Sequence, residues 1–147
     1  MMTKLKTKTN KKGFTVIELV MVVALIAILA AIAIPTVSNV IGTANENVDK
    51  SNAQTVEMAI KTAYAEALAA KDSTLTIGTE SVKAEDLTVT KALKYKGIAT
   101  LPDAKVSGAK WGYKDGKIYL NPKKDSDGIA YPDDFNGMKV KEIVILS

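Results

Sequence analysis

Residues 14–35 read FTVIELVMVVALIAILAAIAIP, and Glu18 carries the only charge in this stretch. At a rise of about 1.5 Å per residue, a helix of this length spans roughly 33 Å, close to the hydrocarbon thickness of a bilayer, about 30 Å. The preceding residues 1–13 contain five lysines and no acid. By the positive-inside rule these lysines hold the N-terminus in the cytoplasm and leave the body of the chain outside. We therefore predict a transmembrane helix over residues 14–35.

Three interpretations of this segment compete. A cleaved secretory signal fits the small residues Ala31-Ile32-Ala33, but the apolar run exceeds the usual length of such signals, about 7–15 residues. An ordinary single-span anchor leaves Glu18 unexplained, because a carboxylate at the centre of a membrane helix costs about 2.5–3.5 kcal/mol and needs a partner. The third interpretation makes Glu18 a functional residue.

The residues around Glu18 favour the third interpretation. Lys11–Leu19 read KKGFTVIEL and lead into the apolar run that ends at Pro35. This pattern resembles the class III signal of type IV pilins, which consists of a basic leader, a Gly, Phe-T-x-x-E and a long apolar helix. The resemblance implies that a membrane aspartyl peptidase, the prepilin peptidase, cuts between Gly13 and Phe14 and N-methylates Phe14. The absence of Cys and of Arg favours a Gram-positive source.

The charge of Glu18 has a physical explanation within this resemblance. Cutting after Gly13 creates an α-amino group on Phe14, which is charged because its pKa is near 7.7–8.0. The amine of a neighbouring subunit, displaced along a filament, can reach Glu18, and at about 4 Å the two charges attract by about 4 kcal/mol. The alternative is that the Glu18 side chain extends from the helix end to the membrane interface.

The helix is expected to continue far beyond the membrane. There is no Gly or Pro between Thr43 and Ile77, and the chain breaks this pattern at Asp72-Ser73-Thr74. Small and apolar residues recur at helical spacing and predict a stripe that packs on the core. The stripe consists of Val37, Ile41, Ala44, Val48, Val56, Ile60, Ala63 and Ala67. Pro35 marks either a kink in this helix or its boundary at the membrane surface.

The C-terminal half is strand-like. Residues 109–120 predict a β-hairpin, because Asp115-Gly116 suits a two-residue type I′ turn. In that register Trp111 faces Leu120 and Tyr113 faces Ile118, so both pairs lie on one apolar face that should cover the helix stripe.

Further strands are predicted with less support from pattern. Residues 138–146 are interpreted as the last strand, and residues 82–89 and 98–106 as possible short strands. Residues 121–137 contain two Pro, two Gly and four Asp and predict a long surface loop. The expected fold is α+β, a long N-terminal helix over about residues 14–71 packed on a small antiparallel sheet, as in pilins.

Amino-acid composition argues against several classes of enzyme and against a nucleic-acid partner. Without Cys or His the chain has no Cys/His nucleophile system and no Ser-His-Asp triad, and no enzyme motif appears. From residue 36 onward 15 Lys balance 15 acids, so no nucleic-acid partner is expected. No cofactor and no metal are expected. Four acidic residues are weak calcium candidates, although position 136, where an EF-hand needs Glu, is Asn. These candidates are Asp125, Asp127, Asp133 and Asp134.

The sequence thus predicts a major-type pilin with three parts. Residues 1–13 form a leader that is removed, residues 14–35 a transmembrane and filament-core helix, and residues 36–147 a globular head that includes the second half of the helix. Gly13 and Phe14 serve processing, and Glu18 and Pro35 serve assembly. The expected partners are the membrane, the prepilin peptidase, an assembly ATPase with its membrane platform, and further copies of the chain in an extracellular pilus.

Two alternatives stay open from sequence. The first is a minor pilin or pseudopilin of a type II secretion or DNA-uptake system, which shares the same N-terminus. The second is a secreted binding module behind a signal cleaved after Ala33. Cell adhesion and twitching motility are activities that the pilin resemblance implies.

Overall fold

The computed structural model describes residues 13–124 and 126–144. It divides into two compact units, residues 1–40 and residues 41–147, and we call the second the head unit. One long helix, α1 (Val16–Ala69), contributes to both units. Its ends lie two residues inside the predicted range of 14–71, and it continues through Pro35. The prediction of a long helix is confirmed, and the alternative of a helix boundary at Pro35 is wrong.

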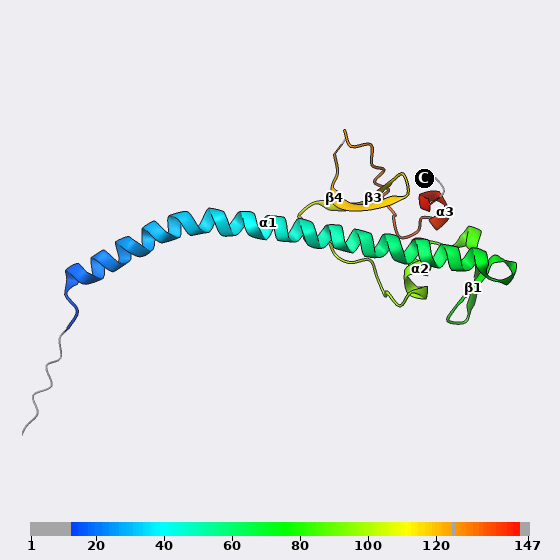
Figure 1. The fold of residues 1–147 in the computed structure, drawn as a ribbon, viewed down its shortest axis with the longest axis horizontal. Coiled ribbons are helices and arrows are strands. Elements are labelled where there is room, and N and C mark those ends of the chain that lie inside the picture. The colour runs from blue at the N-terminus through cyan, green and yellow to red at the C-terminus, as the bar shows by residue number, and fades with distance from the viewer. Residues whose placement is uncertain (1–12, 125, 145–147) are drawn as a thin grey trace, which may run out of the picture. The chain divides into compact units, whose positions relative to one another are not determined.

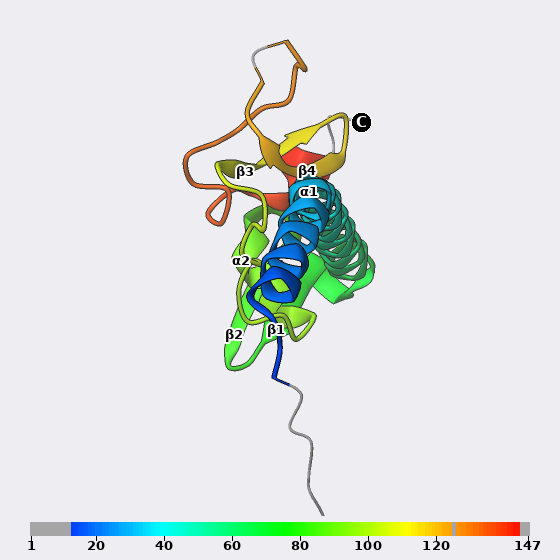
Figure 2. The same ribbon diagram turned by 90° about the vertical axis from the view of Figure 1, so that its left-hand side faces the viewer.

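The head unit adds short helices and strands to the second part of α1. In chain order they are η1 (Lys71–Ser73), β1 (Thr74–Ile77), β2 (Glu80–Lys83), η2 (Ala84–Asp86), α2 (Val89–Tyr95), β3 (Ala109–Lys114), β4 (Lys117–Pro122) and α3 (Val140–Val144). Within the head unit, β3, β4 and α3 lie along one side of α1, and β1 and α2 lie along another (Figure 1). The view along the helix shows the same separation (Figure 2). The predicted α+β fold is confirmed.

The predicted break after α1 is present and has a backbone cause. Asp72 and Ser73 adopt positive φ values of 59° and 50°, which no helix interior accepts. Ser73 donates its backbone N–H to the carbonyl of Ala70 at 3.0 Å, which closes a tight turn. The chain therefore reverses into β1 directly after the helix.

The core of the head unit consists of small α1 residues covered by larger side chains from the other elements. Because Ala59, Ala63 and Ala67 are small, the covering elements approach the helix closely. Ile60, Leu87, Leu93 and Ile143 are the largest side chains that are fully buried. Each hydrophobic side chain of this size contributes about 1.5–3 kcal/mol through burial.

The predicted helix stripe is confirmed only in its second half. Val56, Ile60, Ala63 and Ala67 are buried, but Val37, Ile41, Ala44 and Val48 are exposed. The burial of α1 begins at Asp49, where the loop before β3 first reaches the helix. Helical periodicity alone could not reveal where this cover starts.

The β3–β4 hairpin has the predicted register. Trp111 pairs with Leu120 and Tyr113 with Ile118. The turn residues Asp115 and Gly116 have φ values of 50° and 73°, both positive as a type I′ turn requires. Ile118 and Leu120 are buried and belong to the cluster that includes the α1 stripe. The expected cover of the helix by this face is confirmed.

Instead of one sheet, the head unit has two separate two-stranded sheets, β1–β2 and β3–β4. Residues 98–106 form no strand, so that prediction is wrong. The buried carboxylate of Asp49 accepts the backbone N–H groups of Lys105 at 2.7 Å and Val106 at 2.8 Å. The Asp49 side chain thus supplies the acceptors that a neighbouring strand would otherwise supply to these backbone N–H groups.

The predicted strand over residues 82–89 is mostly wrong. Only Val82 and Lys83 belong to β2, and the chain then forms η2 and enters α2. Thr88 caps α2 by accepting the N–H of Lys91 on its hydroxyl oxygen. At the other end, Ile98 donates to the carbonyl of Leu93 beside Gly97, whose φ is 79°. This glycine-dependent stop ends the helix.

The predicted last strand over residues 138–146 is also wrong within the described residues. Val140–Val144 form α3, and residues 145–147 lie outside the described range. Val140 and Ile143 are fully buried, three residues apart, while Glu142 between them is exposed. This spacing is helical, and it was concealed by the β-branched composition of the segment.

Candidate functional site

The N-terminal part of α1 exposes a continuous apolar surface. Over its most apolar 18-residue window the mean hydropathy is 3.0, and none of that window is buried. Phe14 is 87% exposed, and the large side chains of Leu25, Ile28 and Leu29 are 60–63% exposed. By length and composition the helix is able to cross a membrane.

Glu18 lies in the first turn of this helix and is bonded to Thr15. Its Oε2 accepts the backbone N–H of Thr15 at 2.9 Å and the Thr15 hydroxyl at 2.8 Å. In return, the Glu18 backbone N–H donates to Thr15 Oγ1 at 3.3 Å. This reciprocal pair is a capping box, with Thr15 at the N-cap and Glu18 three residues later. The carboxylate therefore has partners within its own chain.

The capping role of Glu18 was not predicted from the sequence. The signal was present, since Thr15-Val16-Ile17-Glu18 has the T-x-x-E spacing directly before an apolar run. Thr15 is therefore a site residue that sequence reasoning missed.

Of the other predicted processing and assembly residues, Gly13 and Phe14 lie directly before this cap and Pro35 lies farther along α1. Gly13 precedes the helix, and a Cβ built on it would meet nothing within 4 Å. Pro35 lies inside α1, and the Thr36 hydroxyl after it donates to the carbonyl of Ile32 at 3.1 Å. The carbonyl that loses its helical donor because Pro35 has no N–H is that of Ala31, so the Thr36 hydroxyl bonds to the carbonyl next to it. Most of the leader, residues 1–12, lies outside the described residues.

The four calcium candidates do not form a cluster where the structure describes them. Asp125 lies outside the described residues. Asp127 accepts the backbone N–H of Ile129 at 3.0 Å and the Tyr131 hydroxyl at 2.9 Å. Asp134 accepts the N–H of Gly137 at 2.9 Å, and Asp133 is exposed. Over residues 13–124 and 126–144, no three acidic side chains lie close enough together to hold a metal ion.

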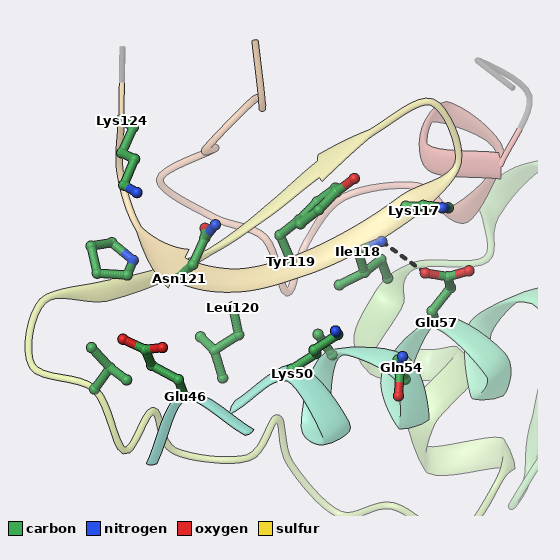
Figure 3. Close-up of a pocket in the computed structure, with 13 residues that line it drawn as sticks. Glu46, Lys50, Gln54, Glu57, Lys117, Ile118, Tyr119, Leu120, Asn121 and Lys124 are labelled. Atoms are coloured by element: carbon green, nitrogen blue, oxygen red, sulfur yellow. Dashed lines mark hydrogen bonds between the residues drawn. The ribbon is translucent and has the colours of Figure 1, made fainter. Parts of the chain in front are cut away.

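A groove of about 580 Å³ lies in the head unit between α1 and the edge of β4. Its rim carries charges of both signs, and Glu57 closes one end by accepting the backbone N–H of Ile118 at 3.0 Å (Figure 3). Lys61 pairs with the same carboxylate at 2.8 Å. Glu57 thus ties the hairpin to the helix. The groove is lined by Glu46, Lys50, Ala53, Gln54, Glu57, Val106, Lys117, Ile118, Tyr119, Leu120, Asn121, Pro122 and Lys124.

Comparison with known proteins identifies the N-terminal segment. Residues 8–34 match the family model described as the prokaryotic N-terminal methylation motif. No curated protein and no solved structure matches the chain. The N-terminal segment therefore carries the class III signal that is typical of type IV pilins and of other substrates of prepilin peptidases. The exposed apolar helix that follows the signal fits a membrane-anchored precursor.

Proposed function

We propose that this chain is a major-type pilin, the repeating subunit of an extracellular type IV pilus. The observation that carries the proposal is the combination of the matched motif with an apolar helix surface that the described residues leave exposed. Neighbouring copies in a filament core would remove that surface from lipid and water. Association of these helices is the mechanism of assembly.

In this proposal the chain first resides in the cytoplasmic membrane as a single-pass precursor. The lysines of the leader keep the N-terminus inside, the prepilin peptidase cuts between Gly13 and Phe14, and Phe14 is N-methylated. An assembly ATPase and its membrane platform then add the mature subunit to the filament. The new amine and Glu18 carry opposite charges, which sets the axial register between subunits.

The cleavage site can be tested by substituting Gly13. We expect Gly13→Val to leave the leader attached, because the larger side chain does not fit the peptidase subsite that the proposal assigns to Gly13. Intact-mass measurement of the protein from cells that contain a prepilin peptidase will detect the retained residues 1–13. The matched control is Gly42→Val in α1, where a Cβ would also meet nothing within 4 Å; this variant should be cleaved and methylated normally.

The results of this experiment separate the proposal from its alternatives. Cleavage of Gly13→Val to normal size would contradict the proposal, and a mature N-terminus at Ile34 would indicate a secreted module instead. The composition of filaments purified from cells that produce the parent chain separates the first alternative. Filaments composed mostly of this chain support a major subunit, whereas filaments that contain only a trace of it would indicate a minor pilin or pseudopilin.

A further inference from the structure

Asn136 and Gly137 form an exposed Asn-Gly pair in the turn that leads into α3. The Gly137 backbone N–H donates to Asp134 Oδ1 at 2.9 Å. The Thr90 hydroxyl oxygen lies 3.0 Å from the Asn136 backbone carbonyl oxygen and 3.5 Å from its side-chain Oδ1. A Cβ on Gly137 would collide with the Asp134 carboxylate, so a larger residue here would have to displace that side chain.

We propose that this turn is a self-modifying site at which Asn136 is converted to aspartate and isoaspartate. The Gly137 nitrogen attacks Asn136 Cγ and forms a new N–C bond, which closes a five-membered succinimide. The bond from Cγ to the side-chain nitrogen breaks, and that nitrogen takes up the proton of the attacking amide and leaves as ammonia. Water then opens the ring at either carbonyl. Opening at one carbonyl gives aspartate and at the other isoaspartate. The sum of the reaction is amide plus water to acid plus ammonia, with no other reactant.

The geometry places a base beside the attacking nitrogen and a hydroxyl beside the amide oxygen. Nitrogen attack releases the amide proton, and the Asp134 carboxylate already accepts that N–H, so it is positioned to act as a general base. Negative charge develops on Asn136 Oδ1 during attack, where the Thr90 hydroxyl can turn to donate. Because Gly137 has no side chain, no Cβ of its own hinders attack by its nitrogen, and exposure of both residues admits the water for hydrolysis.

The other asparagines in the described residues lack this combination and provide internal controls. Asn121 precedes a proline, whose nitrogen carries no hydrogen to release. The remaining ones lie inside α1, where the backbone is held in helical conformation; these are Asn39, Asn45, Asn47 and Asn52.

The conversion would change how the C-terminal segment is held. Directly after Gly137, the Met138 carbonyl accepts the N–H of Val89 at 2.9 Å, and the Val140 N–H donates to Leu87 at 2.8 Å. An isoaspartate at position 136 inserts one extra carbon into the backbone just before these bonds. We expect the modification to weaken the docking of α3. This inference is independent of the proposed function.

The test uses the full chain in detergent micelles, incubated in mildly alkaline buffer at physiological temperature. Peptide mapping by mass spectrometry follows the amide-to-acid mass gain at each asparagine, and an isoaspartate-specific methyltransferase reports the isomer. We expect the gain at Asn136 to precede that at Asn52 and Asn121. In Asp134→Asn an oxygen can still accept the Gly137 N–H, but it is no longer basic. The rate of conversion should therefore fall about tenfold, a smaller effect than the 10²–10⁴-fold that general acid–base catalysis typically contributes.

Two further variants refine the test. Thr90→Val removes the hydroxyl and should slow the reaction by less than Asp134→Asn does. Asn136→Gln cannot close a five-membered ring and should stay unmodified.

Two results would overturn the proposal. If Asn136 in the folded chain reacts more slowly than in a synthetic peptide of residues 131–141, the turn protects the pair instead of activating it. If Asp134→Asn reacts as fast as the parent chain or faster, the carboxylate is not the base.

Discussion

Glu18 combines two roles that can be separated by substitution. Within its own chain it completes the capping box with Thr15, and in our proposal it also pairs with the amine of a neighbouring subunit. A capping box accepts either Glu or Gln at this position, because only an acceptor oxygen is needed. An intersubunit ion pair needs the negative charge.

We therefore predict opposite outcomes for two variants. Glu18→Gln keeps the cap and removes the charge, so it should be inserted and cleaved but should assemble few filaments. Thr15→Val removes the cap hydroxyl and keeps the charge, so filaments should persist with at most a modest loss of helix stability, about 0.5–2 kcal/mol. Counting surface filaments by electron microscopy, with immunoblots for cleavage, measures both. The reverse ranking would mean that Glu18 acts only as a cap.

Tyr131 is a second residue whose environment sets its chemistry. Burial, followed by the hydrogen bond to Asp127, raises the pKa of its hydroxyl to about 12. The hydroxyl also contacts Asn121 Oδ1 at 2.7 Å, so it joins the loop after β4 to the strand itself. A phenol whose pKa is raised on folding stabilises the fold fully below its unfolded value, near pH 10. That contribution is lost as the pH rises through about 12.

This gives a prediction for alkaline solution. An absorbance titration of tyrosinate in the folded chain should contain a component with a midpoint of about 12, and Tyr131→Phe should lack it. The variant should also lose less stability than the parent chain between about pH 10 and pH 12. Tyr119→Phe is the control and should retain the component. Its persistence in Tyr131→Phe would assign the high pKa to another tyrosine.

At the scale of elements, the β3–β4 hairpin depends on a crossing segment at Gly112. Tyr113 forms an isolated antiparallel bridge with Ala130, with both backbone bonds at 2.9 Å. This brings the crossing chain so close that a Cβ on Gly112 would lie 2.7 Å from Ile129 Cγ2 and 2.8 Å from the Ala130 oxygen. Gly112 is needed here for space, not for an unusual φ.

We predict that Gly112→Ala destabilises the head unit by about 1–3 kcal/mol, the usual cost of overpacking. Gly42→Ala is the matched control, because it has open space around its Cβ and lies in a helix. It should stabilise by about 0.5–1 kcal/mol. Urea denaturation monitored by the fluorescence of Trp111, which stacks on Phe135, measures both. Equal effects of the two substitutions would contradict the crossing-segment argument.

At the scale of the whole molecule, the apolar helix surface and the head core belong to different units. The large apolar side chains of residues 14–35 are exposed, whereas the core cluster begins at Ala53. A domain with its own core can fold alone. The head should therefore not depend on the membrane segment for its stability.

We predict that residues 37–147, produced alone, are soluble, monomeric and cooperatively folded without added metal. Analytical ultracentrifugation and thermal unfolding followed by circular dichroism test this. The comparison fragment, residues 53–147, lacks Asp49 and so loses the two hydrogen bonds that its carboxylate accepts from the N–H groups of Lys105 and Val106. Because a hydrogen bond to a charged group contributes about 1.5–3 kcal/mol, this fragment should melt below the longer one. A molten or calcium-dependent fragment 37–147 would contradict this view of the head.

The sequence by itself determined the features that depend on neighbouring residues. The apolar run after Gly13-Phe14, the break at Asp72-Ser73 and the Asp115-Gly116 turn are local, because spacing, charge and backbone preference act within a few residues. Tertiary structure decided the features that depend on distant partners. Val140 and Ile143 form a helix that packs against η2. The end of the 98–106 segment forms no ladder because Asp49 accepts the N–H groups of Lys105 and Val106. The exposed half of the α1 stripe has the same cause, since burial depends on which elements return to the helix and periodicity records only which face is apolar.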